Sequence, residues 1–321
     1  MIYMILFLIS FSLTYFIKEY AIKKSLVATV NERSSHTVPT PHGGGIAVSI
    51  TWFIGLVYLY INDQIDPALF YALIIGAVIA VVGLVDDIVE LSPKLRMMVF
   101  TLVGASGLYI IGGLDTITFG VFDISNDFIT SIFAMLLILW YINLTNFIDG
   151  IDSYLAMKFI FLSLAGMFLF GGADHFGVLG VSVLGFLYWN WHKAKIFMGD
   201  VGSTLLGYTI AIITIYYANI QASNLWIWVT LYGVFWFDAT FTLIRRKLNG
   251  EKLSQAHKKH AYQRLTQAGW SHSKVTIYAL GLNLVIFSFV YFISNIAISF
   301  TLSLVLLYAA YRFVDTKKKF E

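Results

Sequence analysis

At positions 143–152 the chain has the sequence Asn143-Leu144-Thr145-Asn146-Phe147-Ile148-Asp149-Gly150-Ile151-Asp152, directly after the apolar run 128–142. Two carboxamides and two carboxylates recur there in steps of three, so one or two helical turns would present most of them on one side. Such a polar set is costly beside lipid unless it faces water, a cation or a ligand. We therefore interpret the rest of the chain as scaffold or partner for this polar face.

The composition is that of an integral membrane protein. Of the 321 residues, 59% are hydrophobic and only 12% are charged, whereas a soluble domain carries about a quarter charged residues. The formal net charge of +3 does not indicate a nucleic-acid partner, because in a membrane chain the position of the basic residues matters more than their sum. The absence of cysteine excludes disulfides, thiolate metal sites and cysteine nucleophiles. We therefore expect the protein to contact membrane lipid and to have no nucleic-acid partner.

Eleven apolar runs approach the ~20 residues that cross a bilayer. They lie at 1–17, 45–61, 68–85, 97–111, 128–142, 158–170, 176–189, 204–218, 224–243, 275–293 and 297–310. We therefore predict an all-α, polytopic membrane protein with about 11 (10 to 11) transmembrane helices. The break at Gly171-Gly172 leaves open whether two runs form one broken helix. No internal repeat or separate soluble segment is visible, so residues 1–321 are expected to form a single transmembrane domain.

Charge divides the loops between the runs into two classes. Successive loops lie on alternate sides of the membrane. One of these sides holds all 21 Lys and Arg residues if Lys158, at the edge of a predicted helix, is counted with it. The opposite side has none of them and carries Asp63, Asp66, Asp115, Asp123, Asp127 and Asp174. The positive-inside rule assigns the basic side to the cytoplasm. An odd number of spans then predicts an N-terminus outside and a C-terminus in the cytoplasm, where the loops rich in Asn, Asp, His, Arg and Gly also lie.

Two stretches on the predicted cytoplasmic side suit an anion or a cation. The first loop contains Pro39-Thr40-Pro41 and glycines at 43–45, whose fixed backbone and free N–H groups suit an anion, although a stiff connecting loop explains them equally well. The third span ends in Asp86 and Asp87, whose mutual repulsion a divalent cation would relieve. The alternative for this pair is a solvated helix end, and Arg96 nearby is interpreted as charge balance.

Two later loops on the predicted cytoplasmic side also carry candidate residues: one has a carboxylate between glycines, and the other has a pair of histidines. Asp200 can reach a cation there while the backbone stays close to a phosphate. His257 and His260 share a helix face and, with Arg264 a turn later, could grip a diphosphate. Zinc is the rival ligand of paired histidines, but the remaining candidate ligands are Asp and Asn, an oxygen-rich set that suits magnesium better.

A few polar and aromatic residues have competing interpretations. Asp238 lies within the ninth run and is a functional candidate as an intramembrane carboxylate, but a salt bridge to Arg245 or Arg246 explains it at least as well. The same arginines fit the pattern of basic residues that anchor at lipid headgroups. Phe197 is the aromatic residue that we expect to stack on a base.

Five of these stretches together resemble one family, the polyprenyl-phosphate N-acetylhexosamine-1-phosphate transferases, which include the phospho-N-acetylmuramoyl-pentapeptide transferases. They occur in the family's order: Pro39-Thr40-Pro41 with its glycines, Asp86-Asp87, 143–152, 197–203 and 257–264. Arg33-Ser34-Ser35-His36 and the His-x-x-His-Ala-Tyr-Gln-Arg form resemble the bacterial branch that starts O-antigen or related surface glycans. Lys258 and Lys259 interrupt the adjacent histidines that are usual in the peptidoglycan branch. Ser153 departs from the family pattern, in which a glycine commonly follows the second Asp.

The resemblance implies a reaction and a role for each motif residue. Undecaprenyl (polyprenyl) phosphate would attack the β-phosphorus of a UDP-N-acetylhexosamine and release UMP. Asn146 and Asp200 would hold Mg²⁺, with Mn²⁺ as a substitute. The residues that would bind the nucleotide sugar are Asn143, Asp149, Asp152, Phe197, His257, His260 and Arg264. Asp86 or Asp87 would orient or deprotonate the lipid phosphate; since the second pKa of a phosphate monoester is ~6, direct displacement with the Asp pair as organiser is favoured.

Other functions and several details stay open at this point. The peptidoglycan-branch reaction is one alternative. A cation transporter is another, although transporters usually place polar groups near the membrane midplane and often in repeats. The resemblance also implies the bacterial inner (cytoplasmic) membrane, an active site on its cytoplasmic face, and compatibility with a homodimer. The donor sugar is not determined, because N-acetylhexosamines differ by a hydroxyl or its stereochemistry.

Overall fold

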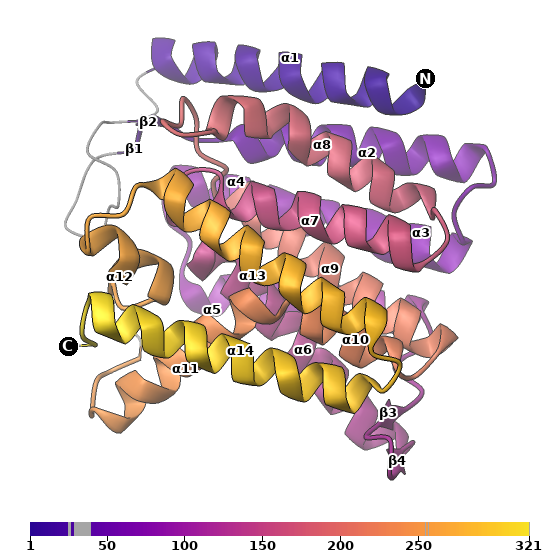
Figure 1. The fold of residues 1–321 in the computed structure, drawn as a ribbon. Helices are drawn as coiled ribbons and strands as arrows, with labels where there is room; N and C mark the ends of the chain where they lie inside the picture. The colour runs from indigo at the N-terminus through magenta and orange to yellow at the C-terminus, as the bar shows by residue number, and fades with distance from the viewer. Residues whose placement is uncertain (25–26, 29–39, 254, 256, 321) are drawn as a thin grey trace.

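The computed structural model describes residues 1–24, 27–28, 40–253, 255 and 257–320 as a bundle of helices (Figure 1). The helices are α1 (Ile2–Lys23), α2 (Gly44–Ile61), α3 (Pro67–Ile74), α4 (Ala77–Val89), α5 (Pro93–Ile110), α6 (Asp127–Ile148), α7 (Tyr154–Leu169), α8 (Asp174–Asn190), α9 (Asp200–Ile220), α10 (Asn224–Leu231), α11 (Gly233–Leu248), α12 (Ala261–Gln267), α13 (His272–Phe292) and α14 (Ile296–Lys317). Two short antiparallel pairs join β1 (Val27–Ala28) to β2 (Thr40–Pro41) and β3 (Ile117–Thr118) to β4 (Asp123–Ile124). The predicted all-α class is therefore confirmed.

The helices are long and apolar enough for a polytopic membrane protein. Within the described residues, seven helical spans pass that test, and the pair α10 and α11, bent by 72°, gives an eighth. Each of the eleven predicted runs lies on a helix or a broken helix, but α5, α7 and α8 are shorter or more polar than the others. The number eleven therefore stays a prediction. The alternative of one broken helix at Gly171-Gly172 is wrong, because α8 turns back and runs beside α7 (Figure 1).

The core of the bundle is α9, and its outer surface is apolar. Nearly every residue of α9 is buried, against α2, α4 and α6 among others. On the outside, Leu102, Leu136 and Leu164 are 60%, 61% and 62% exposed. Water would penalise such side chains at about 25 cal/mol per Å², whereas lipid chains would not. The outer surface therefore fits a hydrocarbon environment.

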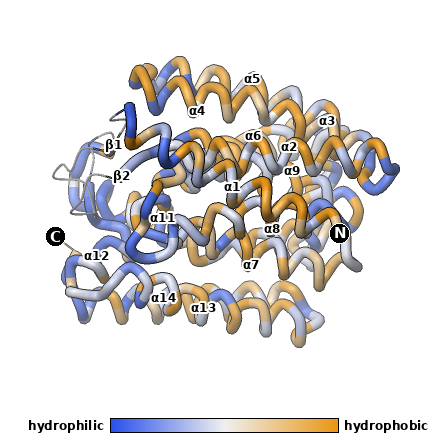
Figure 2. Tube along the Cα trace, turned by 90° about the horizontal axis from the view of Figure 1, so that it is seen from above, coloured by the Kyte–Doolittle hydropathy of each residue, from blue (hydrophilic) through white to orange (hydrophobic). Residues whose placement is uncertain are grey.

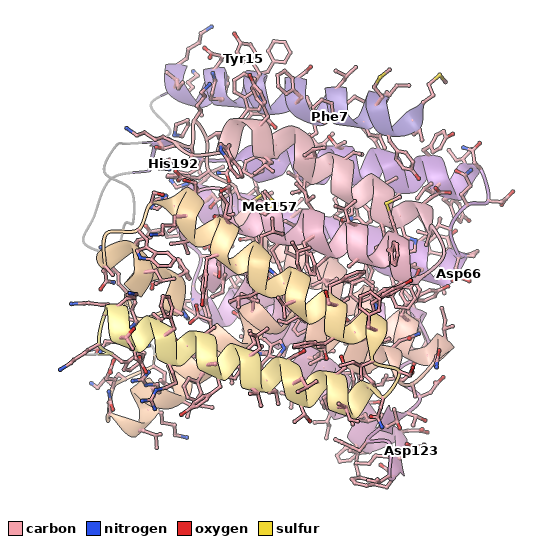
Figure 3. The ribbon with its side chains drawn as sticks, viewed as in Figure 1. Phe7, Tyr15, Asp66, Asp123, Met157 and His192 are labelled. Carbon is pink, nitrogen blue, oxygen red and sulfur yellow. The ribbon has the colours of Figure 1, made fainter. Side chains whose placement is uncertain are left out.

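One end of the bundle is polar and carries the C-terminus. We call this "the polar end", made of β2, the loop 191–199, α12 and the last turn of α14. Hydrophilic residues gather there, and the N-terminus lies at the opposite end (Figure 2). His192 lies at the polar end, whereas Asp66 and Asp123 lie at the other (Figure 3). The two termini are thus at opposite ends, as an odd number of spans predicts.

Glycines let three helices converge at the polar end, where α9 begins. A Cβ on Gly83 of α4 would lie 2.7 Å from the carbonyl oxygen of Asp200. A Cβ on Gly45 of α2 would lie 2.4 Å from the backbone nitrogen of Gly202. Side chains at either position would push α4 or α2 away from α9. The glycines therefore fix the position of the first turn of α9.

Candidate active site

A carboxylate from α4 holds the N-terminus of α9. Asp87 Oδ1 accepts a hydrogen bond from the backbone N–H of Asp200 at 3.0 Å. A carboxylate at a helix start satisfies a free donor and favours the helix dipole. Gly199, just before α9, has a φ of +77°, and a Cβ there would lie 2.5 Å from Asp87 Oδ2. Glycine is therefore required at 199 for this contact, which ties Asp87 to Asp200.

Asp86 has different partners from its neighbour. Its Oδ1 accepts a hydrogen bond from the N–H of Leu91 at 2.7 Å, and its Oδ2 accepts one from Arg96. The other terminal nitrogen of Arg96 lies 3.2 Å from Asp200 Oδ2. Arg96 therefore joins a carboxylate of α4 to one of α9, which is a more specific role than the charge balance expected from the sequence.

Asn146, in the last turn of α6, approaches the same carboxylate from the other side. Its Nδ2 donates to Asp200 Oδ1 at 2.7 Å and to Ser203 Oγ at 3.1 Å. Asn146 and Asp200, which the family resemblance assigns to one metal ion, are therefore in direct contact although 54 residues separate them.

Acidic side chains repel one another around Asp200. Asp149 is the residue that caps the C-terminus of α6. Burial, and then the negative charges of Asp200 and Asp87, raises the pKa of Asp149 to about 8. A divalent cation relieves repulsion of this kind, and carboxylate and amide oxygens are the ligands that Mg²⁺ prefers. The donor set therefore fits Mg²⁺.

The stretch 143–152 is not one continuous helix. Helix α6 ends at Ile148, and Asn143 Nδ2 donates to the carbonyl of Leu139 in the same helix at 2.7 Å. Asp152 lies beyond the helix end, in the turn before α7. The expectation that most of the four polar side chains share one helical face is therefore wrong, because only Asn143 and Asn146 lie within α6, whereas Asp149 caps it and Asp152 lies beyond its end.

Asp152 is held by the loop 191–199 and by the start of α13. Its Oδ2 lies 3.0 Å from His192 Nδ1, 3.2 Å from the N–H of Ala194 and 3.2 Å from His272 Nδ1. Burial favours the neutral carboxyl, but the bonds from His272, Ala194 and His192 outweigh burial and lower the pKa of Asp152. Asp152 is therefore an ionised centre that joins three segments of the chain.

Ser153, the departure from the family pattern, has a φ of +62°. This is the left-handed region, which favours glycine. Its N–H donates to Asn190 Oδ1 at 2.8 Å, and its hydroxyl donates to the carbonyl of Asp152 at 2.6 Å. These two hydrogen bonds help the serine to keep a backbone conformation that glycine would adopt without strain.

Phe197 lies against the segment that leads from β2 to α2. Its N–H donates to the carbonyl of Pro41 at 2.8 Å, and its carbonyl accepts from the N–H of Gly44 at 2.9 Å. The ring centroids of Phe197 and His42 are 6.2 Å apart. The described part of the first motif therefore adjoins the loop that leads to α9. The rest of that motif, 31–39, lies outside the described residues.

Asp238 holds the helix that follows the two histidines. Its Oδ1 accepts a hydrogen bond from the N–H of Ala261, the first residue of α12, at 2.7 Å. The hydroxyl of Tyr262 donates to the carbonyl of Phe147 at 3.1 Å. Asp238 therefore caps α12, and α12 packs on the stretch 143–152.

His257 and His260 lie next to each other, with ring centroids 4.8 Å apart. Burial, followed by the positive charges of His260 and Arg246, lowers the pKa of His257 to about 4. His257 is therefore neutral near pH 7. Arg264 donates to Asp315 of α14 and so is paired with the C-terminal helix. Contact of these three side chains with a diphosphate stays a prediction.

The two arginines at the end of α11 contact protein groups. Arg246 is 1% exposed and donates to Glu251 Oε2 at 3.0 Å. Arg245 donates to both carboxylate oxygens of Asp315, at 2.9 and 3.1 Å. The expectation that they anchor at lipid headgroups is therefore wrong for Arg246, which instead folds the loop after α11.

The structure adds three residues that the sequence did not single out for this site: Arg96, His192 and His272. Arg96 had a signal, because it follows Asp86 by ten residues, in the same loop that the sequence predicts. His192 and His272 had none, because they meet Asp152 across 40 and 120 residues of chain.

The known proteins to which this chain is similar have names that describe related transferases. Residues 69–218 match the family model described as glycosyl transferase family 4. A "Probable undecaprenyl-phosphate N-acetylglucosaminyl 1-phosphate transferase" of Bacillus subtilis is 35% identical over 84% of this chain and 78% of its own length. A "Decaprenyl-phosphate N-acetylglucosaminephosphotransferase" of Mycobacterium tuberculosis is 31% identical over 83% of this chain and 76% of its own. A "Phospho-N-acetylmuramoyl-pentapeptide-transferase" of Shouchella clausii is 28% identical over 74% and 78%.

Proposed function

Since the chain belongs to glycosyl transferase family 4, we propose that it transfers N-acetylhexosamine 1-phosphate from a UDP-sugar to polyprenyl phosphate. The relatives reported above support the transfer of a sugar phosphate to such a lipid. The observation that carries the proposal is the contact of Asn146 with Asp200 at the polar end. An oxygen of the lipid phosphate bonds to the β-phosphorus, the bond from that phosphorus to the bridging oxygen breaks, and UMP leaves. This would be the first membrane step of a surface glycan such as O-antigen.

Mg²⁺ is the cofactor that we propose for this site. Asn146 and Asp200 would hold it, and the raised pKa of Asp149 supports a place for a cation there. When bound, the ion neutralises charge on the diphosphate. Mn²⁺ prefers similar oxygen ligands and would substitute.

The Asp pair is proposed as an organiser. Asp87 accepts from the N–H of Asp200, and Asp86 accepts from Arg96 and the backbone of Leu91. Both carboxylates are thus engaged in holding other groups. Because the lipid phosphate is already largely a dianion at neutral pH, with a second pKa of ~6, it gains little from a general base. Direct displacement follows from these two points.

The nucleotide sugar is proposed to bind beside the loop 191–199. Phe197 would stack on the uracil, and Asp152 would fix the loop that carries Phe197 through its bond with Ala194. Asn143 and Asp149 lie on the α6 side of the same region. His257 and His260, with Arg264 behind them, would donate hydrogen bonds toward the diphosphate.

The reaction is proposed to take place at the cytoplasmic face of the bacterial inner membrane. The polar end carries the basic loops, which the positive-inside rule places in the cytoplasm. UDP-sugars are water-soluble and would reach that face, while undecaprenyl phosphate would come from the bilayer. A homodimer belongs to the same proposal and is tested by the mass of the purified protein in detergent.

The test is UMP release by the detergent-purified chain with undecaprenyl phosphate, Mg²⁺ and a panel of UDP-sugars, UDP-N-acetylglucosamine first. We expect UMP only when the lipid is present, loss of activity with EDTA, and recovery with Mg²⁺. Asp200→Asn should abolish turnover, whereas Asp123→Asn at the opposite end should not change it. Lipid-independent UMP, or full activity of Asp200→Asn, would contradict the proposal.

A second candidate reaction is that of the peptidoglycan branch, because one relative carries that name. The donor would then be a UDP-N-acetylmuramoyl pentapeptide. Lys258 and Lys259 between the two histidines argue against this branch. Including that donor in the panel distinguishes the two reactions.

A further inference from the structure

Lys158 is a lysine buried among the apolar helices. The apolar run that the sequence predicts begins at this residue and so places it at a helix edge, but α7 begins at Tyr154, one turn earlier. The residue is only 2% exposed, and both of its hydrogen-bond partners are neutral groups. An ionisable side chain inside a membrane helix is costly, and such residues usually have a function. Lys158 therefore needs an explanation that packing alone does not supply.

The surroundings of Lys158 Nζ fit a charged ammonium group. Nζ donates to the carbonyl of Leu231 at 2.6 Å and to Asn283 Oδ1 at 2.5 Å. Three aromatic rings also surround it, with centroids 5.1, 5.7 and 5.5 Å away: Phe161, Tyr232 and Phe235. An ammonium group is a donor only, and the faces of aromatic rings within about 6 Å attract a cation. The charge is thus compensated without a carboxylate.

The carbonyl of Leu231 is available because the helix breaks there. Helix α10 ends at Leu231 and α11 begins at Gly233, with a bend of 72° between them. In a continuous helix this carbonyl would accept from the N–H of Phe235. That N–H donates instead to the carbonyl of Tyr232, at 3.0 Å. Lys158 takes the place of the missing donor, and a cation at the C-terminus of α10 also suits the helix dipole. Lys158 therefore stabilises the break.

The break places Tyr232 against the site described above. The hydroxyl of Tyr232 lies 2.5 Å from Thr145 Oγ1. Thr145 Oγ1 itself donates to the carbonyl of Tyr141 at 2.5 Å, so the tyrosine is the donor in the first bond. Thr145 directly precedes Asn146, which donates to Asp200. The break between α10 and α11 is therefore connected to Asn146 through one hydrogen bond and one peptide unit.

We propose that Lys158 is a positioning residue of the transferase. By holding the break between α10 and α11, it keeps Tyr232 bonded to Thr145 and so keeps Asn146 in place to bind the metal ion. The proposal rests on the proposed function, because it assigns Lys158 a part in the same reaction. If Lys158 only filled space, an apolar side chain of similar length would replace it without loss. Lys158→Met makes that distinction.

The first test measures the break itself and requires no activity. The chain has no cysteine, so spin labels can be attached to Ile220→Cys at the end of α9 and Leu248→Cys at the end of α11, which are 63% and 80% exposed. We expect a narrow distribution of distances between the labels in the labelled parent and a shifted or broader one in Lys158→Met. Ser163→Ala, at a buried polar residue of the same helix, is the control and should match the parent. An unchanged distribution in Lys158→Met overturns the proposal.

The second test measures UMP release at different Mg²⁺ concentrations, well below the unfolding temperature of each variant. Lys158→Met should lower turnover and raise the Mg²⁺ concentration for half-maximal activity about 10-fold, the lower limit of what the loss of outer hydrogen bonds costs a metal site. Lys158→Arg keeps a cationic donor and should recover part of the turnover. An unchanged Mg²⁺ requirement in Lys158→Met overturns the proposal. A parent protein that releases no UMP contradicts the proposed function instead, and the label distances then still decide whether Lys158 holds the break.

A double-mutant cycle tests whether Lys158 acts through Tyr232. Tyr232→Phe removes only the hydroxyl and should also raise the Mg²⁺ requirement. The double variant should need no more Mg²⁺ than Lys158→Met alone, because both changes remove the same contact, whereas independent changes add. Additive effects overturn the proposal. If Lys158→Met does not fold, Tyr232→Phe, which keeps the ring, decides alone: an unchanged Mg²⁺ requirement in this variant also overturns it.

Discussion

Arg96 shows how one side chain connects the two acidic motifs of the site. It contacts Asp86 and Asp200, which lie on different helices. Its positive charge occupies space beside Asp200 that a cation would also use. Arg96 is therefore expected to organise the carboxylates and to compete with Mg²⁺ for them.

Replacing Arg96 by Gln should lower turnover roughly 10- to 100-fold, because a hydrogen bond to a charged group is worth about 1.5–3 kcal/mol. The Mg²⁺ concentration for half-maximal activity should fall, because the competing charge is gone. Arg96→Lys should keep part of the activity. Lys94→Gln, at an exposed neighbouring position, is the control. Normal turnover of Arg96→Gln would exclude the role.

His257 gives a prediction on pH. Its pKa is lowered from 6.5 to about 4, so the folded protein keeps it neutral where the unfolded chain binds a proton. The stability that it contributes is present above about pH 6.5 and is lost as the pH falls toward 4. The unfolding temperature in detergent should therefore fall less between these pH values in His257→Asn than in the unaltered protein. Parallel curves would contradict this.

At the scale of the elements, the start of α9 is the part that every neighbouring helix positions. Gly83 of α4 and Gly45 of α2 permit the backbone contacts, while Asp87 and Asn146 bind its first residue. Helices packed this closely cannot accept a new methyl group without moving. The geometry around Asp200 is therefore sensitive to changes that do not touch its side chain.

Gly83→Ala should displace Asp200, because the added Cβ would lie 2.7 Å from its carbonyl oxygen. Overpacking typically costs about 1–3 kcal/mol, so we expect a lower unfolding temperature and reduced UMP release. Gly281→Ala is the matched control, because nothing lies within 4 Å of a Cβ there. Equal behaviour of the two variants would show that this contact does not position Asp200.

Helix α12 depends in the same way on Asp238. Asp238→Ala removes the acceptor for the N–H of Ala261, and the loss of a side-chain acceptor at a helix N-terminus costs about 0.5–2 kcal/mol. Asp238→Asn keeps an acceptor oxygen and should retain most of the stability. We expect the unfolding temperature to be highest for the unaltered protein, lower for Asp238→Asn and lowest for Asp238→Ala. If Asn is as damaging as Ala, the negative charge and not the cap is what matters.

For the whole molecule, the separation of the two ends predicts membrane orientation. The chain has no cysteine, so single cysteines can be introduced and labelled without background. A membrane-impermeant maleimide should label Asp123→Cys in intact cells and Lys193→Cys only after permeabilisation. Both positions are exposed. The reverse pattern would invert the orientation, and labelling of both in intact cells would contradict opposite faces.

The pairing of Asn146 with Asp200 could be predicted from the sequence, because the family resemblance assigns both to one ion. The end of α6 at Ile148 could not be predicted, because the last residue of a helix is poorly defined where an apolar segment is followed by polar residues. The partners of Asp238 and Arg246 were also missed. Asp238 binds the backbone of the first residue of α12 and Arg246 that of the loop after α11, and periodicity predicts neither contact.

The sequence by itself determined that the chain is a helical membrane protein with chemistry at one end. Long apolar runs must satisfy their backbone hydrogen bonds within a helix in lipid, and loop charges separate according to side. Only the tertiary structure decided which side chains meet: Asp87 and Arg96 with Asp200, and His192 and His272 with Asp152. These pairs are distant in sequence or on different helices, so they depend on close helix packing that local patterns do not encode.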